Sequence, residues 1–177
     1  MANDTKNIVR ASKPVLDFLM GDKGQVDFAK VIMPEYLDSA DCRRDTWGTS
    51  SNAYETEFKD GDLHFETAWS APLAVIFRLS EIFPDEEIKF AFADEGNWDN
   101  YLVCAIEDGV ITKARIFQEG APEGYNLWCL IYWGQTGRAH ARDIEVSDPD
   151  AFLDDSYDVF STLKPVIGEE WARGFYR

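Results

Sequence analysis

Three carboxylates and an imidazole gather within a short stretch of this chain, at Glu55, Glu57, His64 and Glu66. Carboxylate oxygens are good ligands for divalent cations, and imidazole is a common ligand for transition metals. Two carboxylates held close together can also share a proton. The set therefore predicts a metal-binding or proton-sharing site, or else an ordinary solvent-facing strand surface on which the side chains splay apart.

A predicted β-hairpin positions these four residues. Residues 53–59 and 62–69 alternate polar and apolar side chains and flank Asp60-Gly61, a pair typical of two-residue hairpin turns. Such a turn places all four side chains on one face, with Glu55 directly opposite Glu66 and the other two members opposite each other. Like charges in opposite positions destabilise a sheet, so this pair indicates either a ligand or neighbouring cations.

Other catalytic signatures are absent from the sequence. It has no phosphate-binding or dinucleotide-binding glycine motif, no serine-hydrolase elbow and no zinc-protease motif. The three cysteines, Cys42, Cys104 and Cys129, are too widely spaced for a structural zinc motif and indicate reduced thiols in a cytosolic protein. The leading interpretation is a protein without a cofactor and without an enzymatic active site.

The chain is strongly acidic, with 33 Asp and Glu against 17 Lys and Arg and a net charge of −16. This balance disfavours direct binding to nucleic acid or to an anionic membrane, which both need a basic surface. Residues 84–99 carry six acidic side chains and one lysine, and residues 143–158 carry seven acidic side chains and no base. These stretches are either solvated faces that aid solubility or a surface that engages a basic partner.

Candidate partner-binding residues come from these two stretches. They are Asp85, Glu86, Glu87, Asp94, Glu95, Trp98, Asp150, Asp154, Asp155 and Asp158. A helix predicted over 149–163 spaces three of the last four acids one turn apart. Trp98 follows a turn between acids and is the aromatic residue best placed to anchor an interface. Ordered carboxylates can occupy the DNA groove of a nuclease, so the pattern predicts a DNA-mimic-like inhibitor.

The order of predicted elements indicates an α+β fold. These elements are strand 5–10, helix 13–20, the two hairpin strands, helix 72–83 and strand 87–94. This βαββαβ order is the split βαβ arrangement of ferredoxin-like folds, with two helices on one face of a four-stranded antiparallel sheet. We expect residues 1–95 to form this domain, with an irregular insertion at about 21–51.

The remaining residues, 96–177, are predicted to form a β-rich extension. A second Asp-Gly pair at 108–109 separates two alternating runs and predicts another hairpin. The apolar run 127–133 is interpreted as a buried strand, and the extension ends in the acidic amphipathic helix. We expect it to pack with the first domain as one globular unit. No apolar run is long enough to span a membrane, and no signal-peptide pattern opens the chain.

Three phrases carry a family resemblance. VDFAKVIMPEYL (26–37), TWGTSSNAYETEF (46–58) and FETAWSAPLAVIFRLSEIFP (65–84) resemble the YubB-type ferredoxin-like family of plasmid and phage proteins. The chain departs from that pattern at Ser50-Ser51, where the family is expected to have Lys-Trp after W-G-T. The resemblance implies a ferredoxin-like fold and a mobile-element origin, and it supplies no catalytic residues.

The leading functional hypothesis is a non-enzymatic, cytoplasmic binding protein of a phage or plasmid. It would engage a basic protein surface, such as that of a host nuclease, restriction enzyme or CRISPR complex, without contacting nucleic acid or membrane itself. One alternative is a metal-binding protein or small metal-dependent enzyme that uses the hairpin face. Another is a homo-oligomeric structural accessory.

Overall fold

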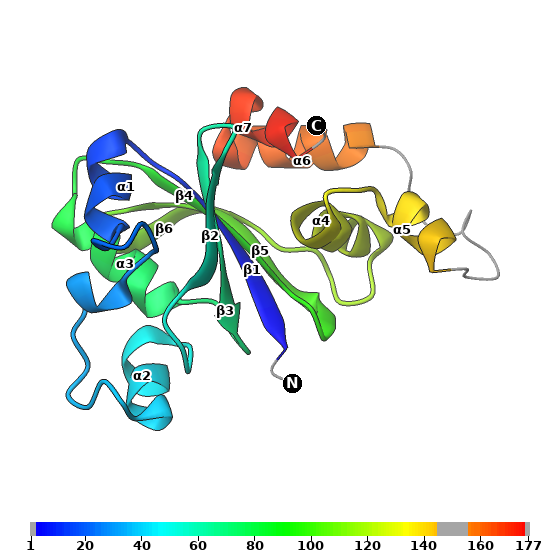
Figure 1. Cartoon of the computed structure of the whole chain (residues 1–177). Coiled ribbons are helices and arrows are strands. Elements are labelled where there is room, and N and C mark those ends of the chain that lie inside the picture. Colours follow the sequence, from blue (N-terminus) through cyan, green and yellow to red (C-terminus); the bar gives the residue numbers. More distant parts are fainter. Residues whose placement is uncertain (1–2, 145–155, 176–177) are drawn as a thin grey trace.

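One six-stranded antiparallel sheet separates two groups of helices, as the computed structural model shows (Figure 1). The structure describes residues 3–144 and 156–175. The strands are β1 (Asp4–Arg10), β2 (Tyr54–Lys59), β3 (Asp62–Ala68), β4 (Ile88–Asp94), β5 (Asn97–Glu107) and β6 (Val110–Arg115). They lie in the order β2-β3-β1-β4-β5-β6, and every neighbouring pair is antiparallel.

The first four strands have the predicted split βαβ arrangement. β1 and β2 are joined through α1 (Lys13–Leu19) and have β3 between them, while β3 and β4 are joined through α3 (Leu73–Ile82) and have β1 between them. Each βαβ unit is therefore split by one strand of the other, which is the ferredoxin-like topology. β5 and β6 continue the same sheet beyond β4. The predicted α+β, ferredoxin-like fold class is confirmed.

The helices form one layer on each face of the sheet. The layer on the first face contains α1, the 3-10 helix η1 (Phe28–Lys30), α2 (Ala40–Trp47) and α3. The layer on the second face contains α4 (Pro122–Trp133), α6 (Ser156–Ile167) and α7 (Glu169–Gly174), with α5 (Gly137–Asp143) packed on α4. Alternate strand residues enter two separate cores, Val9 and Phe65 on the first face and Ile8 and Val103 on the second. Among the described residues, no helix combines the length and the apolar character that crossing a membrane requires.

Both predicted hairpins are confirmed. Asp60 and Gly61 have φ angles of 53° and 87°, and Asp108 and Gly109 have φ angles of 45° and 71°. Two successive positive φ values are the signature of the type I′ turn, whose twist matches that of the flanking strands. The Asp-Gly pairs thus fix the β2–β3 and β5–β6 connections.

The W-G-T and T-A-W-S phrases meet where β3 leads into α3. The Ser70 hydroxyl donates to the carbonyl of Gly48, and the Thr49 hydroxyl donates to the carbonyl of Ala68 at 2.9 Å. The Thr67 hydroxyl donates to the carbonyl of Ser70 at 2.8 Å. These hydrogen bonds tie the end of α2 to the β3–α3 connection, so the most recognisable residues of the sequence have a structural role.

The predicted strand at 127–133 is wrong, because these residues form the second half of α4. The helix has Pro122 in its first turn and ends at Gly134, whose φ angle is 69°, and both are common helix boundary signals. Residues 127–132 are all buried, so their apolar pattern does not distinguish a strand from an enclosed helix. The extension expected to be β-rich adds β5 and β6 to the sheet and is otherwise helical in its described part.

The segment expected to be irregular, 21–51, contains two helical elements, η1 and α2. Ser39 begins α2 by accepting a hydrogen bond from the Cys42 amide at 3.2 Å, which is ordinary N-terminal capping. The helix predicted over 149–163 is described only from residue 156, where α6 begins, and α6 continues to Ile167. Residues 149–155 lie outside the described part.

Gly48→Ala should destabilise the protein more than Gly24→Ala. Both glycines have positive φ, 85° and 72°, where a side chain costs roughly 1–2 kcal/mol. A Cβ at Gly48 would also lie 3.2 Å from the carbonyl oxygen of Ala71, whereas nothing lies within 4 Å of one at Gly24. Urea unfolding should therefore show the larger loss for Gly48→Ala. Equal losses would mean that the α2–α3 contact yields easily.

Candidate binding groove

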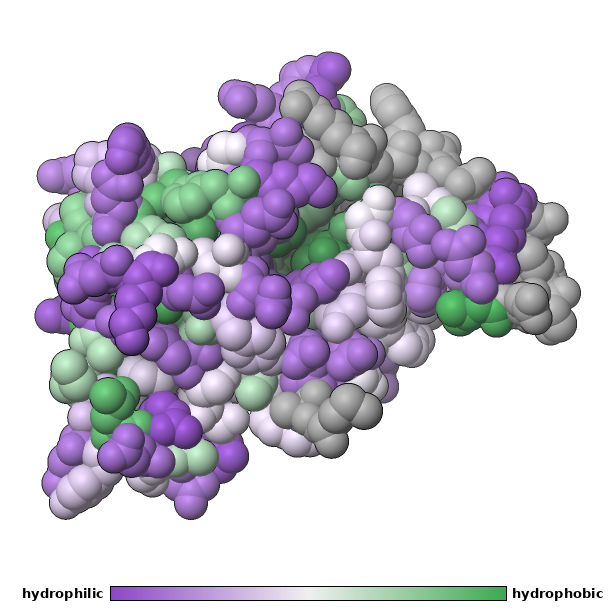
Figure 2. All heavy atoms as spheres, in the orientation of Figure 1, coloured by the Kyte–Doolittle hydropathy of each residue, from purple (hydrophilic) through white to green (hydrophobic). Residues whose placement is uncertain are grey.

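An open groove lies over the half of the second face that β1, β2 and β3 form. α4 packs against β4 and β5, and α6 packs against β5 and β6, which leaves the other half less covered. The groove has a volume of about 560 Å³ and is bounded by the three strands, the carboxyl end of α4 and α7. Figure 2 shows a hollow near the middle of the displayed face, with apolar residues at its bottom and hydrophilic residues around it.

The strand sequences explain why the helices cover only one half of this face. β4 and β5 direct Ala91, Ala93 and Val103 at the second layer, and all three are fully buried. β1 and β3 direct polar and charged side chains at the same face, among them Lys6 and Glu66. Burying unpaired charges under a helix is costly, so the apolar half is covered and the charged half lines a groove.

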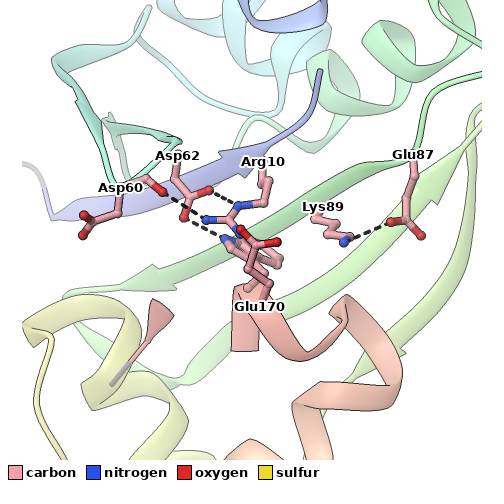
Figure 3. A network of polar contacts seen from close by, with 7 residues as sticks. Arg10, Asp60, Asp62, Glu87, Lys89 and Glu170 are labelled. Atoms are coloured by element: carbon pink, nitrogen blue, oxygen red, sulfur yellow. Dashed lines mark hydrogen bonds and ion pairs between the residues drawn. The ribbon is translucent and has the colours of Figure 1, made fainter. Parts of the chain in front are cut away.

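A buried carboxylate closes one end of the groove. Asp62 is only 6% exposed and accepts hydrogen bonds from Arg10 Nε at 2.5 Å and from Trp171 Nε1 at 2.8 Å. Arg10 also donates to the carbonyl of Asp60 at 3.2 Å, and its Nη1 lies 3.8 Å from a carboxylate oxygen of Glu170 (Figure 3). These contacts attach α7 to β1 and β3, and they satisfy the carboxylate that the fold buries.

At the carboxyl end of α4, the groove holds the ammonium group of Lys6 against aromatic rings. Lys6 Nζ donates to the carbonyl of Tyr132 at 2.8 Å and lies 4.8 Å from the centre of the Tyr132 ring. It also lies 5.9 Å from the centre of the Trp133 ring, which is 47% exposed. Carbonyl acceptors and aromatic faces both attract cations. This end of α4 is therefore suited to cationic groups.

The predicted pairing of Glu55 with Glu66 is wrong. Near the turn the register is as expected, with Glu57 opposite His64, but a bulge follows and places Tyr54 opposite Glu66. Glu55 takes a left-handed conformation with a φ angle of 47°, which lets β2 carry one extra residue opposite β3. The bulge thus removes the direct like-charge pair that a regular hairpin would contain.

Burial shifts the pKa values of His64 and Glu66 in directions that favour their neutral forms. Burial lowers the pKa of His64; Asp62 opposes this shift, and Lys59 adds to it. Burial raises the pKa of Glu66, and Lys6, its neighbour on β1, opposes that rise. His64 is therefore a neutral imidazole at neutral pH, so the carboxylates determine the sign of the groove's charge.

The metal-binding alternative for the hairpin face stays a prediction. Within residues 3–144 and 156–175, no group of three or more His, Cys, Asp or Glu side chains has an arrangement that could hold a metal ion. Glu55, Glu57, His64 and Glu66 do all line the groove. The structure thus brings the four predicted residues to one hollow, where they do not form such a group.

The acidic residues predicted as one partner-binding surface lie in separate places. Asp85, Glu86 and Glu87 fall between α3 and the start of β4, whereas Asp94 and Glu95 fall at its other end. β4 has seven residues, so the two groups are about 20 Å apart along the strand. They do not form one patch.

Four of those residues have partners within the protein. Glu87 pairs with Lys89 at 3.2 Å, and Glu95 accepts a hydrogen bond from the Asp4 amide at 3.2 Å. Asp94 is 6% exposed and accepts hydrogen bonds from the Gly96 amide at 2.7 Å and from Asn100 Nδ2 at 3.3 Å. Trp98 is half-buried, and its ring centre lies 5.5 Å from that of Tyr125. Asp150, Asp154 and Asp155 lie outside the described residues, and Asp158 lies in α6.

The helical walls of the groove have no local signal in the sequence. Tyr132, Trp133 and Trp171 come from helices that follow the hairpin by more than sixty residues, and no local pattern marks them as neighbours of His64. The apolar run that contains the first two was itself assigned to a strand. The usable signal was the polar alternation of β3, which indicates a sheet face that helices leave open.

Comparison with known families agrees with this topology. Residues 46–126 match the model of a family described as the ferredoxin-like domain in Api92-like protein. The chain therefore contains a ferredoxin-like domain. The matched range runs from the end of α2 through β2 to β6 and into α4, so it includes the hairpin side of the groove and excludes β1 and α7. Comparison with curated proteins and with solved structures finds no match.

Trp171→Phe should destabilise the ferredoxin-like domain by removing the indole donor from Asp62. A hydrogen bond to a charged group contributes roughly 1.5–3 kcal/mol, and the smaller ring adds a packing defect. The matched control is Trp133→Phe, because Trp133 is 47% exposed and should change the free energy of unfolding by about 0.5 kcal/mol or less. Equal effects in urea unfolding would contradict the role given to Asp62.

His64→Gln should flatten the pH dependence of stability. Because the folded state lowers the pKa of His64, the unfolded state binds more protons, and stability falls as pH drops below about 6.5. Urea unfolding at several pH values should show a smaller loss for His64→Gln than for the wild type. Burial lowers the pKa of His140 as well, so part of the dependence should remain. An unchanged pH profile would contradict the burial of the His64 imidazole.

Proposed function

We propose that this protein is a non-enzymatic binding protein whose groove receives a basic segment of a partner protein. The observation that carries the proposal is the charge of the groove lining, which has five carboxylates against Lys6 and Lys59. Lys6 is already held by Tyr132, and Asp62 is already paired with Arg10. The groove therefore offers carboxylates to an incoming cation and little positive charge to oppose it.

Four of those carboxylates are available to a ligand. Glu55, Glu57 and Asp60 are exposed, Glu66 is half-buried, and no described residue forms a hydrogen bond or ion pair with their carboxylates. The aromatic surface of Trp133 lies in the same hollow and can contact the aliphatic part of a lysine or an arginine. The net charge of −16 adds long-range attraction that speeds encounter with a basic partner.

In its finer form, the proposal assigns the protein to a phage or plasmid and its partner to a host defence complex. A nuclease, restriction enzyme or CRISPR complex presents the basic surface that this chemistry recognises, because it binds nucleic acid. The resemblance to the YubB-type family supports the mobile-element setting. The protein would act on the partner's basic surface and not on nucleic acid.

A defined peptide tests the groove directly. Binding of a fluorescent arginine-serine repeat peptide should be detectable by anisotropy at low salt and should weaken as salt approaches physiological strength, where the Debye length is about 8 Å. Glu55→Gln with Glu57→Gln should weaken binding about tenfold, which is equivalent to ~1.4 kcal/mol. A glutamate-serine repeat peptide and duplex DNA should not bind.

The matched control removes the same charge elsewhere. Asp85→Asn with Glu86→Gln also neutralises two acids, but in the loop before β4, which the sequence alone favoured as a partner surface. This variant should bind the peptide as the wild type does. Equal weakening by both variants would reduce the effect to general charge attraction, and absence of binding at low salt would overturn the proposal.

A further inference from the structure

The two edges of the sheet differ in how they are protected. β2 forms one edge and carries Glu55, Glu57 and Lys59, together with a bulge and a left-handed residue. Charged side chains and bulges are the usual features that prevent an edge strand from pairing with another chain. The β2 edge is therefore poorly suited to strand addition.

β6, at the other edge, also contains a bulge and carries Lys113 and Arg115 in its second half, but its first half presents exposed β-branched side chains. Val110 is 61% exposed and Ile111 is 38% exposed, and Ile116, just beyond the strand, is 65% exposed. No strand among the described residues pairs with its outer side, so a row of backbone donors and acceptors is open there. An unpaired edge whose first residues are exposed and apolar is a template for pairing with a strand of another molecule.

The charges along this edge specify which strand fits. Glu107 and Asp108 precede β6, and Lys113 and Arg115 lie in its second half, so the edge runs from acidic to basic. Glu107 and Lys113 lie on the same face of the sheet, because Lys113 pairs with Ala105 and Ala105 is two residues from Glu107 on β5. An antiparallel neighbour with the same order of charges places acid beside base at both ends.

The strand with that order is β6 of a second copy. We propose that the protein forms a symmetric dimer through antiparallel pairing of β6 with β6. A two-fold axis perpendicular to the sheet makes the contact self-complementary and closes it at two copies. The paired edges bury Val110 and Ile111 of both copies, and each Lys113 lies near the partner copy's acidic turn.

The dimer leaves both grooves open. The groove lies over β1, β2 and β3, and β2 is separated from β6 by the whole width of the sheet, about 24 Å at the usual strand spacing. The two grooves would therefore lie at opposite ends of one continuous sheet. The dimer does not depend on the proposed function, since β6 contributes no residue to the groove.

A charge exchange tests the pairing in the intact chain. Glu107→Lys cancels the net negative charge of the acidic end, and Lys113→Glu cancels the net positive charge of the basic end, so each variant alone should be monomeric in sedimentation analysis where the wild type is dimeric. A mixture of the two variants should form a heterodimer, because each new charge then faces its opposite. Phe58→Lys, at a 54% exposed position on the β2 edge, should remain dimeric.

Each outcome decides the proposal. A wild type that stays monomeric at the highest soluble concentration overturns it, as does dimerisation of Glu107→Lys and Lys113→Glu equal to that of the wild type. Failure of the folded variants to pair in the mixture also overturns it, and thermal melting verifies that they are folded. As a second measurement, amide exchange over residues 110–115 should slow with protein concentration in the wild type and not in Lys113→Glu.

Discussion

The second face of the sheet is apolar over β4 and β5 and charged over β1 and β3, and the arrangement of the helices follows from this division. Ala91, Ala93 and Val103 offer a flat apolar surface on which α4 and α6 can pack. Lys6 and Glu66 cannot be buried under a helix without leaving charges desolvated. The boundary between the two halves therefore becomes the edge of a groove, with the fold continuous beneath it.

The contact between Asp62 and Trp171 shows how the charged half is kept open without exposing a core. Asp62 loses its water when α7 packs against the strands, and it recovers two hydrogen bonds, from Arg10 and from the Trp171 indole. The arginine also meets Glu170 at the surface. The last described helix is thus fixed by polar contacts of Glu170 and Trp171 and by apolar packing of Ala172 and of Phe175, which follows the helix.

The elements that the sequence predicts well are those whose signals are local. Asp60-Gly61 fixes a hairpin by itself, and the register next to the turn, with Glu57 opposite His64, follows from it. The bulge beyond this point has no such signal, because Glu55 adopts positive φ without being glycine. A register extended from the turn is therefore correct as far as Glu57 and wrong beyond it. The direct pairing of Glu55 with Glu66, on which the metal hypothesis depended, is wrong for the same reason.

The part of the groove that could not be predicted is the part built by distant helices. The aromatic run 127–133 satisfies strand and buried-helix patterns equally, and only its boundaries, Pro122 and Gly134, favour a helix. Once that run is helical, Tyr132 and Trp133 lie at its carboxyl end beside Lys6. A cation bound between a carbonyl and two rings is thus a product of the tertiary fold. The proposed binding of a basic segment uses this wall together with the carboxylates of β2.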